Sequence, residues 1–438
     1  MKSGRAMGGL DPRNGPKQMT LASDISPSHE TSLRYAGWRV VLACFIMAMF
    51  LFGFGLYGQS VYLAELQRLN GWTAGLISGA STLSLLLCNI LAMFTNELAA
   101  RLGHRRLVLL GVAALAASTT LLALASSPWQ LYAAFILMAF GWIDMGMIVI
   151  AAIVSLWFVR RRGLALSVAF TGASAGGVIV TPLLLLLVER LGFPAAMLTA
   201  TAIMVAVLVP VIFGWIGLPS AGDTFEPGVA AGSQHQAASA PGEISRADLM
   251  RRAAFWTLSI PFALGLLAQV GFIVHQIALL EPKVGYASAG VAVSMMTLSA
   301  IVGRLGLGMV VDRFVPRFVA AGSLVSQAAA LLIILQADTA STILAASALF
   351  GFSVGNLITL PPLIIHREFD AASFVVVMGL SNAISGTVGA LGPVLVGLVR
   401  GWSGNYDSSL VLCMVLELVA AVIVVQRGPR PVSPAASA

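Results

Sequence analysis

Apolar runs long enough to cross a lipid bilayer recur along this 438-residue chain. A membrane-spanning helix needs about 20 mostly apolar residues, and twelve such segments account for most of the sequence. Backbone groups inside hydrocarbon must be hydrogen-bonded within the segment, so unbroken runs of this length form helices. The sequence therefore predicts an all-α integral membrane protein with twelve transmembrane helices. The expected spans are residues 36–63, 73–95, 107–125, 129–156, 164–188, 194–218, 254–280, 289–311, 317–336, 341–363, 373–399 and 407–425.

The composition agrees with a chain that lives in lipid. Hydrophobic residues make up 58% and charged residues 10% of the sequence, which is too little polar surface for a water-soluble globule of this size. The first 34 residues are polar and lack the apolar core of a signal peptide, so the first span itself is expected to start insertion. Cys44, Cys88 and Cys413 fall inside expected spans and are expected to pack there, without a disulfide or a metal.

Lys and Arg are divided unequally between the two sides of the predicted membrane. Twenty fall on one set of connections and tails and four on the other, namely Arg68, Arg190, Lys283 and Arg400, with Arg304 inside a span. Cytoplasmic connections are the ones enriched in Lys and Arg, so we expect both termini in the cytoplasm of a cell (inner) membrane. This asymmetry explains the net charge of +7 without a nucleic-acid partner.

The longest interruption between spans, residues 219–253, is rich in Gly, Ala, Ser and Pro and is predicted to be a flexible cytoplasmic linker. It separates six-helix halves at 36–218 and 254–425, flanked by cytoplasmic tails at 1–35 and 426–438. Short segments of the halves match at offsets of 218, 212 and 211 residues, beginning with Trp38 and Trp256. Such an internal repeat is typical of secondary transporters.

Arg304 interrupts the eighth span about eight residues before its cytoplasmic end, or roughly 12 Å at 1.5 Å per residue. A charged side chain at the centre of a transmembrane helix costs about 2.5–3.5 kcal/mol, so it should face water, a carboxylate or a ligand. The planar guanidinium fits a carboxylate and keeps its charge. We therefore expect Arg304 to bind an anionic substrate; the alternative is a structural pair with a helix end or a protein acid.

Asp144 and His275 are the candidates for proton coupling. Asp144 lies within about 6 Å of the depth of Arg304 along its own span, where desolvation favours a neutral carboxyl and a nearby cation favours a charged one. A fixed ion pair, or a carboxylate facing a water-filled cavity, is the alternative. Histidine titrates near neutrality, so His275 is a candidate at the outer gate, with a hydrogen-bonded packing role as the alternative.

Polar and small residues inside the spans complete the candidate set. Side chains able to donate hydrogen bonds to a substrate are Tyr57, Gln59, Asn356 and Asn382. Small residues allow helices to approach closely in lipid, and we expect those of the fifth span to pack the two halves together. The residues assigned to helix packing are Gly172, Gly176, Gly177, Pro182, Gly392 and Pro393.

The turn after the eighth span, "GMVVDRFVPR", contains Gly308, Asp312, Arg313 and Arg317 and resembles the signature of the major facilitator superfamily. The matching turn after the second span, "NELAARLGHRR", departs from that signature at Asn96 and Ala100. The resemblance implies two six-helix halves that alternate access, a peripheral twelfth span with Glu417 as a structural residue, and a gating role for these turns. The gating residues carried over from both turns are Gly308, Asp312, Arg313, Arg317, Arg101 and Arg105.

A second stretch, "WFVRRRGLALSVAFTGASAGG" (157–177), is similar to monocarboxylate transporters and their bacterial relatives, including oxalate/formate exchangers. The resemblance implies that Arg304 matches a substrate-contacting arginine of the eighth span. Ala300 stands where many relatives have an aspartate, and residues 52–60 lack a lysine found in the family's first span. Arg160 and Arg162 are candidates for gating, with membrane anchoring as the alternative.

The sequence thus predicts a secondary active transporter of small organic monocarboxylates, either a proton-coupled symporter or a related antiporter. A single buried cation favours a monocarboxylate over a dicarboxylate. Its expected partners are a small organic anion, protons and the lipid bilayer; we expect a monomer with no cofactor and no metal. The alternatives are an exporter of drugs or other metabolites and an organic-anion exchanger. An enzyme is disfavoured because the expected spans contain no clustered metal ligands or nucleophile–base pair.

Overall fold

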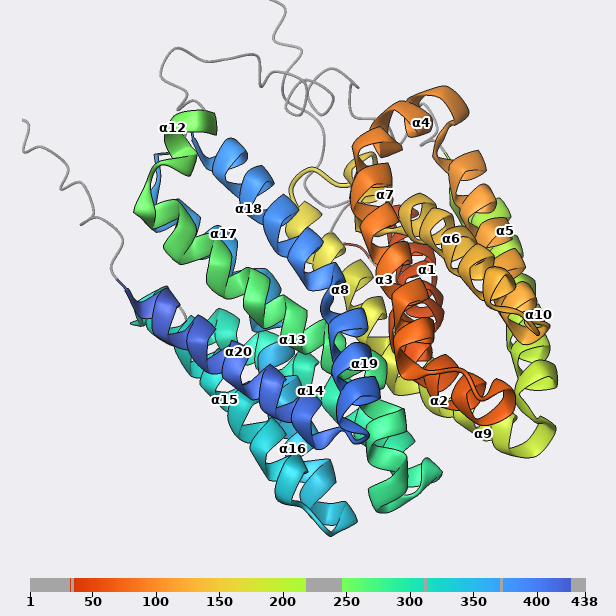
Figure 1. Cartoon of the computed structure of the whole chain (residues 1–438). Helices are drawn as coiled ribbons and strands as arrows, with labels where there is room; N and C mark the ends of the chain where they lie inside the picture. The colour runs from red at the N-terminus through yellow and green to blue at the C-terminus, as the bar shows by residue number, and fades with distance from the viewer. Residues whose placement is uncertain (1–31, 33–34, 218–245, 311–312, 371–372, 427–438) are drawn as a thin grey trace, which may run out of the picture.

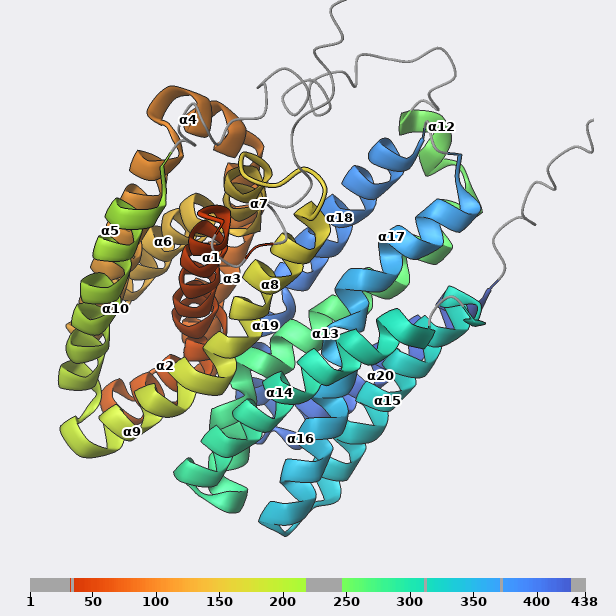
Figure 2. The ribbon, with the colours of Figure 1, turned by 180° about the vertical axis from the view of Figure 1, so that it is seen from behind.

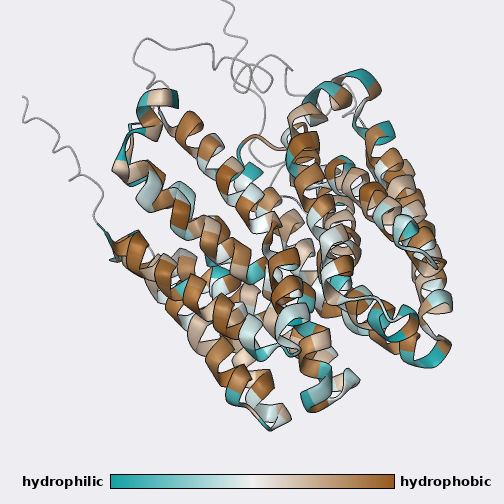
Figure 3. Ribbon diagram, in the orientation of Figure 1, coloured by the Kyte–Doolittle hydropathy of each residue, from teal (hydrophilic) through white to brown (hydrophobic). Residues whose placement is uncertain are grey.

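The computed structural model describes residues 32, 35–217, 246–310, 313–370 and 373–426, and for residues 308–310 it describes the backbone alone. Twelve helices in these ranges are long and apolar enough to cross a membrane, which confirms the predicted all-helical fold. Polar residues gather near the helix ends, and apolar residues cover much of the helix lengths (Figure 3).

The first half contains six spans, several of which are interrupted. They are α1 (Gly37–Phe52) with η1 (Gly53–Tyr57) and α2 (Gly58–Asn70); α3 (Ala74–Leu91) with η2 (Ala92–Phe94) and α4 (Thr95–Leu102); α5 (His104–Ala123); α6 (Pro128–Met145) with α7 (Met147–Ser155); α8 (Arg162–Ala175) with η3 (Gly176–Val180) and α9 (Thr181–Leu191); and α10 (Phe193–Trp215).

The second half repeats this arrangement. Its helices are α12 (Arg246–Met250), α13 (Ala253–Val284), α14 (Tyr286–Val310), α15 (Pro316–Gln336), α16 (Ala340–Val354) with α17 (Asn356–Glu368), α18 (Phe374–Ala390) with α19 (Gly392–Ser403), and α20 (Asp407–Val425). Most of the predicted linker and both tails lie outside the described residues. The described end of the linker includes the short helix α12, which the prediction of a flexible segment did not anticipate.

Glycine allows several spans to end and the next to begin within one or a few residues. Gly103, Gly192 and Gly285 have φ between +77° and +81° and directly join consecutive spans. This left-handed region is strained for residues with a Cβ. The sharp turns therefore depend on glycine.

The two halves lie side by side and contact each other mainly at one end (Figures 1 and 2). Cross-half packing joins α2 to α13, α3 to α19, and η3 and α9 to α14. At the other end, where α1 begins and α20 ends, α4 and α7 diverge from α12 and α18 (Figure 1). We call this the basic end, because Arg101, Arg105, Arg160, Arg162, Arg313 and Arg317 lie there; the packed end is the opposite end.

Candidate functional site

Arg304 extends from the face of α14 that meets the first half. Thr297 lies two turns earlier on the same face, and a Cβ added at Gly177 of η3 would overlap the side chain of Thr297. Two turns of helix correspond to about 10 Å. The half-buried Arg304 therefore lies on the inter-half surface, nearer the basic end than this close contact.

The tenth span is interrupted beside Arg304. Gly355 separates α16 from α17, and a Cβ at Gly355 would lie 3.1 Å from Nε of Arg304. The fourth span is also interrupted at a glycine, Gly146, where the backbone leaves the helical region with ψ −178°, whereas Gly355 keeps helical angles. The two glycines are 209 positions apart, close to the offset of the sequence repeat. Interruptions at matching positions in two halves are typical of transporter binding sites.

Tyr57 brings the first half close to the same position. It is the last residue of the π-helical turn η1, a geometry that is frequent at functional sites. Its side chain is buried, and the guanidinium of Arg304 is near enough to act on its hydroxyl electrostatically. A cation from α14 and a phenol from η1 therefore lie within electrostatic range of each other across the two halves.

Arg304 has no ion-pair partner among the residues that the structure describes. The salt bridges found there join Arg68 to Glu65 and Arg317 to Glu368. The guanidinium contacts Gly355, which has no side chain to neutralise it. An unneutralised cation between two apolar bundles is chemically suited to bind an anion.

The remaining predicted hydrogen-bond donors do not gather around Arg304. Gln59 is buried and donates from Nε2 to the carbonyl of Gly55, one turn earlier in its own span. Asn356 donates to Oγ of Ser323 at 2.9 Å, and thus faces α15. Asn382 is exposed on α18.

Asp144 is buried in the last turn of α6, two residues before the interruption at Gly146. A Cβ at Gly111 of α5 would lie 2.8 Å from Cβ of Asp144, so this residue is oriented toward α5. None of the salt bridges found between described residues includes Asp144. Asp144 and Arg304 were expected at a similar depth, but no contact between them is found among the described residues.

His275 is fully buried, and both ring nitrogens have partners. Nε2 lies 3.0 Å from the carbonyl oxygen of Pro393, and Nδ1 lies 3.2 Å from the hydroxyl of Tyr406. These contacts tie α13 to the start of α19 and to the turn before α20. The geometry matches that of a hydrogen-bonded packing histidine.

At the basic end, Arg317 makes several contacts with neighbouring helices. Arg317 binds Glu368 of α17 through Nε–Oε1 and Nη2–Oε2 contacts of 2.6 and 2.7 Å. Its Nη1 also donates to the carbonyls of Thr257, at 3.3 Å, and Val424, at 2.9 Å. Arg317 thereby joins the ends of α13, α15, α17 and α20 that lie at the basic end. Glu368 was missed in the sequence because no local motif marks it.

Arg105 occupies the equivalent position in the first half. Nη2 donates to the carbonyl of Phe213 at 2.7 Å, and the guanidinium lies 4.6 Å from the centre of its ring. Arg105 thus links α5 to α10 as Arg317 links α15 to α20. The other described turn arginines, Arg101, Arg160, Arg162 and Arg313, are exposed. Asp312 lies outside the described residues, and Gly308 lies in α14.

The predicted packing glycines serve two different contacts. A Cβ at Gly172 would overlap the backbone carbonyl of Phe45, and one at Gly176 that of Met49. These two glycines therefore pack α8 and η3 on α1 within the first half, and not between the halves as expected. Gly177 does contact the other half, through Thr297.

The matching segment of the second half packs in a similar way. A Cβ at Gly392 would overlap the carbonyl of Leu267, so α19 lies close against α13, and Pro393 follows with its carbonyl bound to His275. Pro182 occupies the first turn of α9. Proline thus lies in the first turn of both α9 and α19, the second helices of the fifth and eleventh spans.

At the opposite end, Glu65 is a buried acid that the sequence interpretation missed. Its carboxylate is 3.2 Å from Nη2 of Arg68, and the hydroxyl of Tyr286, at the start of α14, lies beside it. This contact joins α2 to the second half. Glu65 fell outside the expected first span, which was predicted to end at residue 63, whereas α2 continues to Asn70.

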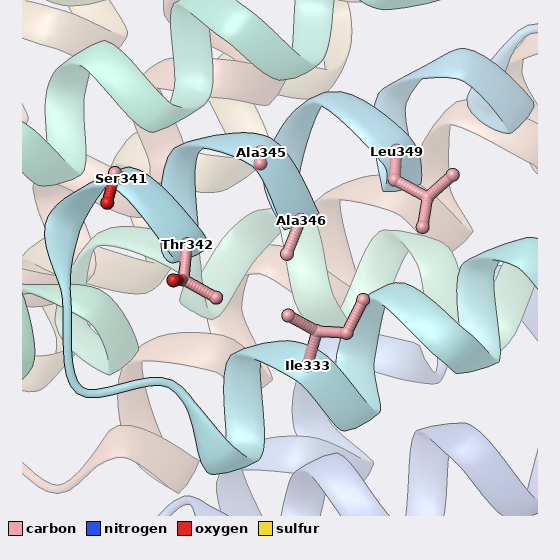
Figure 4. A pocket seen from close by; sticks show the side chains of 6 residues that line it. All are labelled: Ile333, Ser341, Thr342, Ala345, Ala346 and Leu349. Carbon is pink, nitrogen blue, oxygen red and sulfur yellow. The ribbon is translucent and has the colours of Figure 1, made fainter.

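A hollow of about 450 Å³ lies elsewhere, between α15 and α16 (Figure 4). It is lined by Ile333, Ser341, Thr342, Ala345, Ala346 and Leu349. None of these side chains is charged, and neither Gly355 nor Arg304 is among the lining residues. The hollow is therefore not part of the candidate site around Arg304.

Comparisons with known proteins agree with this architecture. A rat protein, Monocarboxylate transporter 13, is 26% identical over 400 residues, covering 89% of this chain and 88% of its own. The MFS-type transporter pynF of Aspergillus niger is 26% identical, with 87% and 86% covered.

Solved structures with the same fold include a bacterial homologue of the lysosomal transporter Spinster in an inward-facing, unoccupied conformation. It has a TM-score of 0.66 and 13% identity, covering 90% of this chain and 97% of its own. The nucleoside transporter NupG gives a TM-score of 0.67 at 12% identity, with 89% and 97% covered. The sequence model of the Major Facilitator Superfamily matches residues 45–393. The chain therefore belongs to the major facilitator superfamily.

Proposed function

We propose that this chain carries small organic monocarboxylates across a membrane, coupled to protons, by alternating access between its two halves. That it is a multi-pass membrane transporter and not an enzyme follows from its family and from its transporter relatives. The observation that carries the finer proposal is Arg304, a cation on the inter-half surface that has no described acidic partner and lies within electrostatic range of Tyr57.

The proposed site uses two groups of different character. The guanidinium of Arg304 offers two parallel N–H donors to a carboxylate, and this charge-assisted geometry is strong and directional. The hydroxyl of Tyr57 donates a further hydrogen bond from the first half. A substrate held by both groups would link the halves, so its binding would be sensitive to their relative position.

The net charge of the site favours a monocarboxylate. One carboxylate neutralises one guanidinium, whereas a second carboxylate would remain unpaired in an apolar setting at considerable cost. Monocarboxylate transporters among the relatives support this substrate class.

For proton coupling we propose Asp144. It is buried beside the interruption at Gly146, which matches the interruption at Gly355 beside Arg304. Because Asp144 faces α5, coupling would act through movement of the α6–α7 interruption and not through direct contact with the bound anion. We also propose that the basic end faces the cytoplasm, on the strength of its excess of Lys and Arg.

An exporter of larger metabolites is the second candidate. A stretch of 58 residues is 40% identical to the Fujikurins efflux protein of Gibberella fujikuroi, although this covers only 13% of the chain. Such a substrate would not require a carboxylate at Arg304.

Uptake into liposomes distinguishes these functions. Purified protein is reconstituted, and labelled lactate, pyruvate and formate are offered with and without an inward proton gradient. The proposal expects saturable uptake that the gradient accelerates and that unlabelled monocarboxylates inhibit. Transport of lipophilic compounds without inhibition by any monocarboxylate would refute it in favour of export.

A further inference from the structure

Glu417 is fully buried inside the second half, and neither of its carboxylate oxygens has a hydrogen-bond partner. It projects from α20 toward α13, where a Cβ at Gly265 would lie 3.7 Å from Oε2. The carboxyl group therefore lies within contact range of α13 at Gly265. Buried polar groups are almost always satisfied by protein, water or an ion, so this carboxyl group requires an explanation.

Two amide oxygens on neighbouring helices are buried and unpartnered as well. Gln327 of α15 donates from Nε2 to Oε1 of Gln269 at 3.1 Å, which leaves its own Oε1 free. Asn356 of α17 donates from Nδ2 to Ser323 at 2.9 Å, which leaves its Oδ1 free. Each of these two amides thus donates one hydrogen bond through its nitrogen and keeps its oxygen as an unpartnered acceptor.

These groups belong to one packed region of the second half. The side chains of Leu324 and Leu357 flank Gly265, and Ser323 and Asn356 immediately precede them in α15 and α17. Gln269 lies one turn beyond Gly265 on the same face of α13. Among the helices that carry the set, α17 and α20 each pack against both α13 and α15.

The charged and titratable groups on these helices do not neutralise Glu417. The guanidinium of Arg317 is bound to Glu368, and it reaches α20 only at Val424, two turns from Glu417. Cys413, one turn away on α20, is near enough to interact with Glu417 but is not a cation. Neither of the salt bridges found among the described residues includes Glu417, so no described cation neutralises it.

We propose that Glu417 anchors a small monovalent cation, a proton or Na⁺, within the second half. A proton on the carboxyl group would convert it into a donor for a neighbouring amide oxygen, and Na⁺ would be held by carboxylate and amide oxygens, the ligands that hard cations prefer. Among the described residues, no three His, Cys, Asp or Glu side chains are grouped so that they could hold a metal ion, and this disfavours a transition metal as the ligand. The site is separate from Arg304, which faces the first half, and does not depend on the proposed substrate.

Thermal unfolding of the purified full chain in detergent tests the site. A cation that binds only the folded state raises the melting temperature by mass action. For a Na⁺ site, the melting temperature rises saturably with NaCl but not with choline chloride at equal ionic strength. For a proton site, it falls as pH rises, whatever the salt. Glu417→Gln, which is isosteric and permanently neutral, should abolish the response, whereas Asp407→Asn, at the exposed start of the same helix, should retain it.

Wild-type protein that responds to neither cation overturns the proposal, as does a Glu417→Gln variant that keeps the full response. A second measurement needs no variant and covers the case in which Glu417→Gln does not fold. A hydrophobic carbodiimide modifies protonated carboxyl groups in apolar surroundings, and mass spectrometry locates the adduct. Labelling of Glu417 should fall on addition of Na⁺ or on raising the pH; labelling that is absent, or that neither condition alters, contradicts the proposal.

Discussion

Replacing Arg304 with alanine should remove most of the affinity for carboxylates without unfolding the protein. The guanidinium contacts Gly355 and has no described acidic partner, so its loss leaves no protein charge unpaired. The variant should therefore melt within a few degrees of wild type. A destabilised variant would instead mean that Arg304 has a structural partner.

The size of the affinity loss follows from the chemistry of the pair. A hydrogen bond to a charged group contributes about 1.5–3 kcal/mol, and a bidentate pair contains two. Arg304 is half-buried, so water screens part of this interaction, and we expect about 2–3 kcal/mol in total. At about 1.4 kcal/mol per factor of ten, this corresponds to a roughly 30- to 150-fold weaker Kd. Arg304→Lys keeps the charge but loses the fork geometry, and should weaken binding by about tenfold.

Equilibrium binding of a labelled monocarboxylate to purified protein, with uptake into liposomes in parallel, measures this effect. Arg190→Ala is the matched control, because Arg190 is exposed near the end of α9 and belongs neither to the proposed site nor to the turns with a gating role. It should bind like wild type. If Arg304→Ala binds carboxylates within threefold of wild type, the proposed anion site is wrong.

Three further predictions test the surrounding structure. Arg317→Ala removes a buried pair and should cost about 3–5 kcal/mol of stability; Glu368→Gln should lower the melting temperature in the same direction, and strictly additive effects of the two changes would contradict direct coupling. Gly177→Val should slow transport, because its side chain would meet Thr297, whereas Gly163→Val has no atom within 4 Å of the added Cβ and should not; equal rates would exclude a role for this contact. Asp144→Asn should abolish acceleration of uptake by a proton gradient while substrate exchange continues, and a variant that still responds to the gradient would remove Asp144 from coupling.

Hydropathy predicted the twelve spans but not where the helices end. The first span was expected to stop at residue 63, yet α2 continues to Asn70 through Glu65 and Arg68. Likewise, α4 extends the second span to Leu102. These extensions are polar because they leave the hydrocarbon or pack against the other half, so a search for apolar runs ends too early.

The proposed anion site was predictable in part. Arg304 stands out because a charge inside an apolar run has few structural explanations. Asp144 was selected by its depth along the helix, which does not determine the direction in which its side chain points. In the structure, its Cβ lies against Gly111 of α5. For the same reason, Gly172 and Gly176 were assigned to the wrong interface. Assigning a helix face requires knowing which helices are neighbours, and this information is tertiary.

The distribution of contacts bears on how the halves would move in the proposed cycle. Arg105 ties α5 to α10 and Arg317 ties α15 to α20, so each half is internally braced at the basic end. Packing between the halves is concentrated at the opposite end, where Glu65 lies beside Tyr286. Opening that end would separate this carboxylate from the second half while leaving both arginine contacts intact. These contacts support the proposal that the halves move as units, with Arg304 on the surface between them.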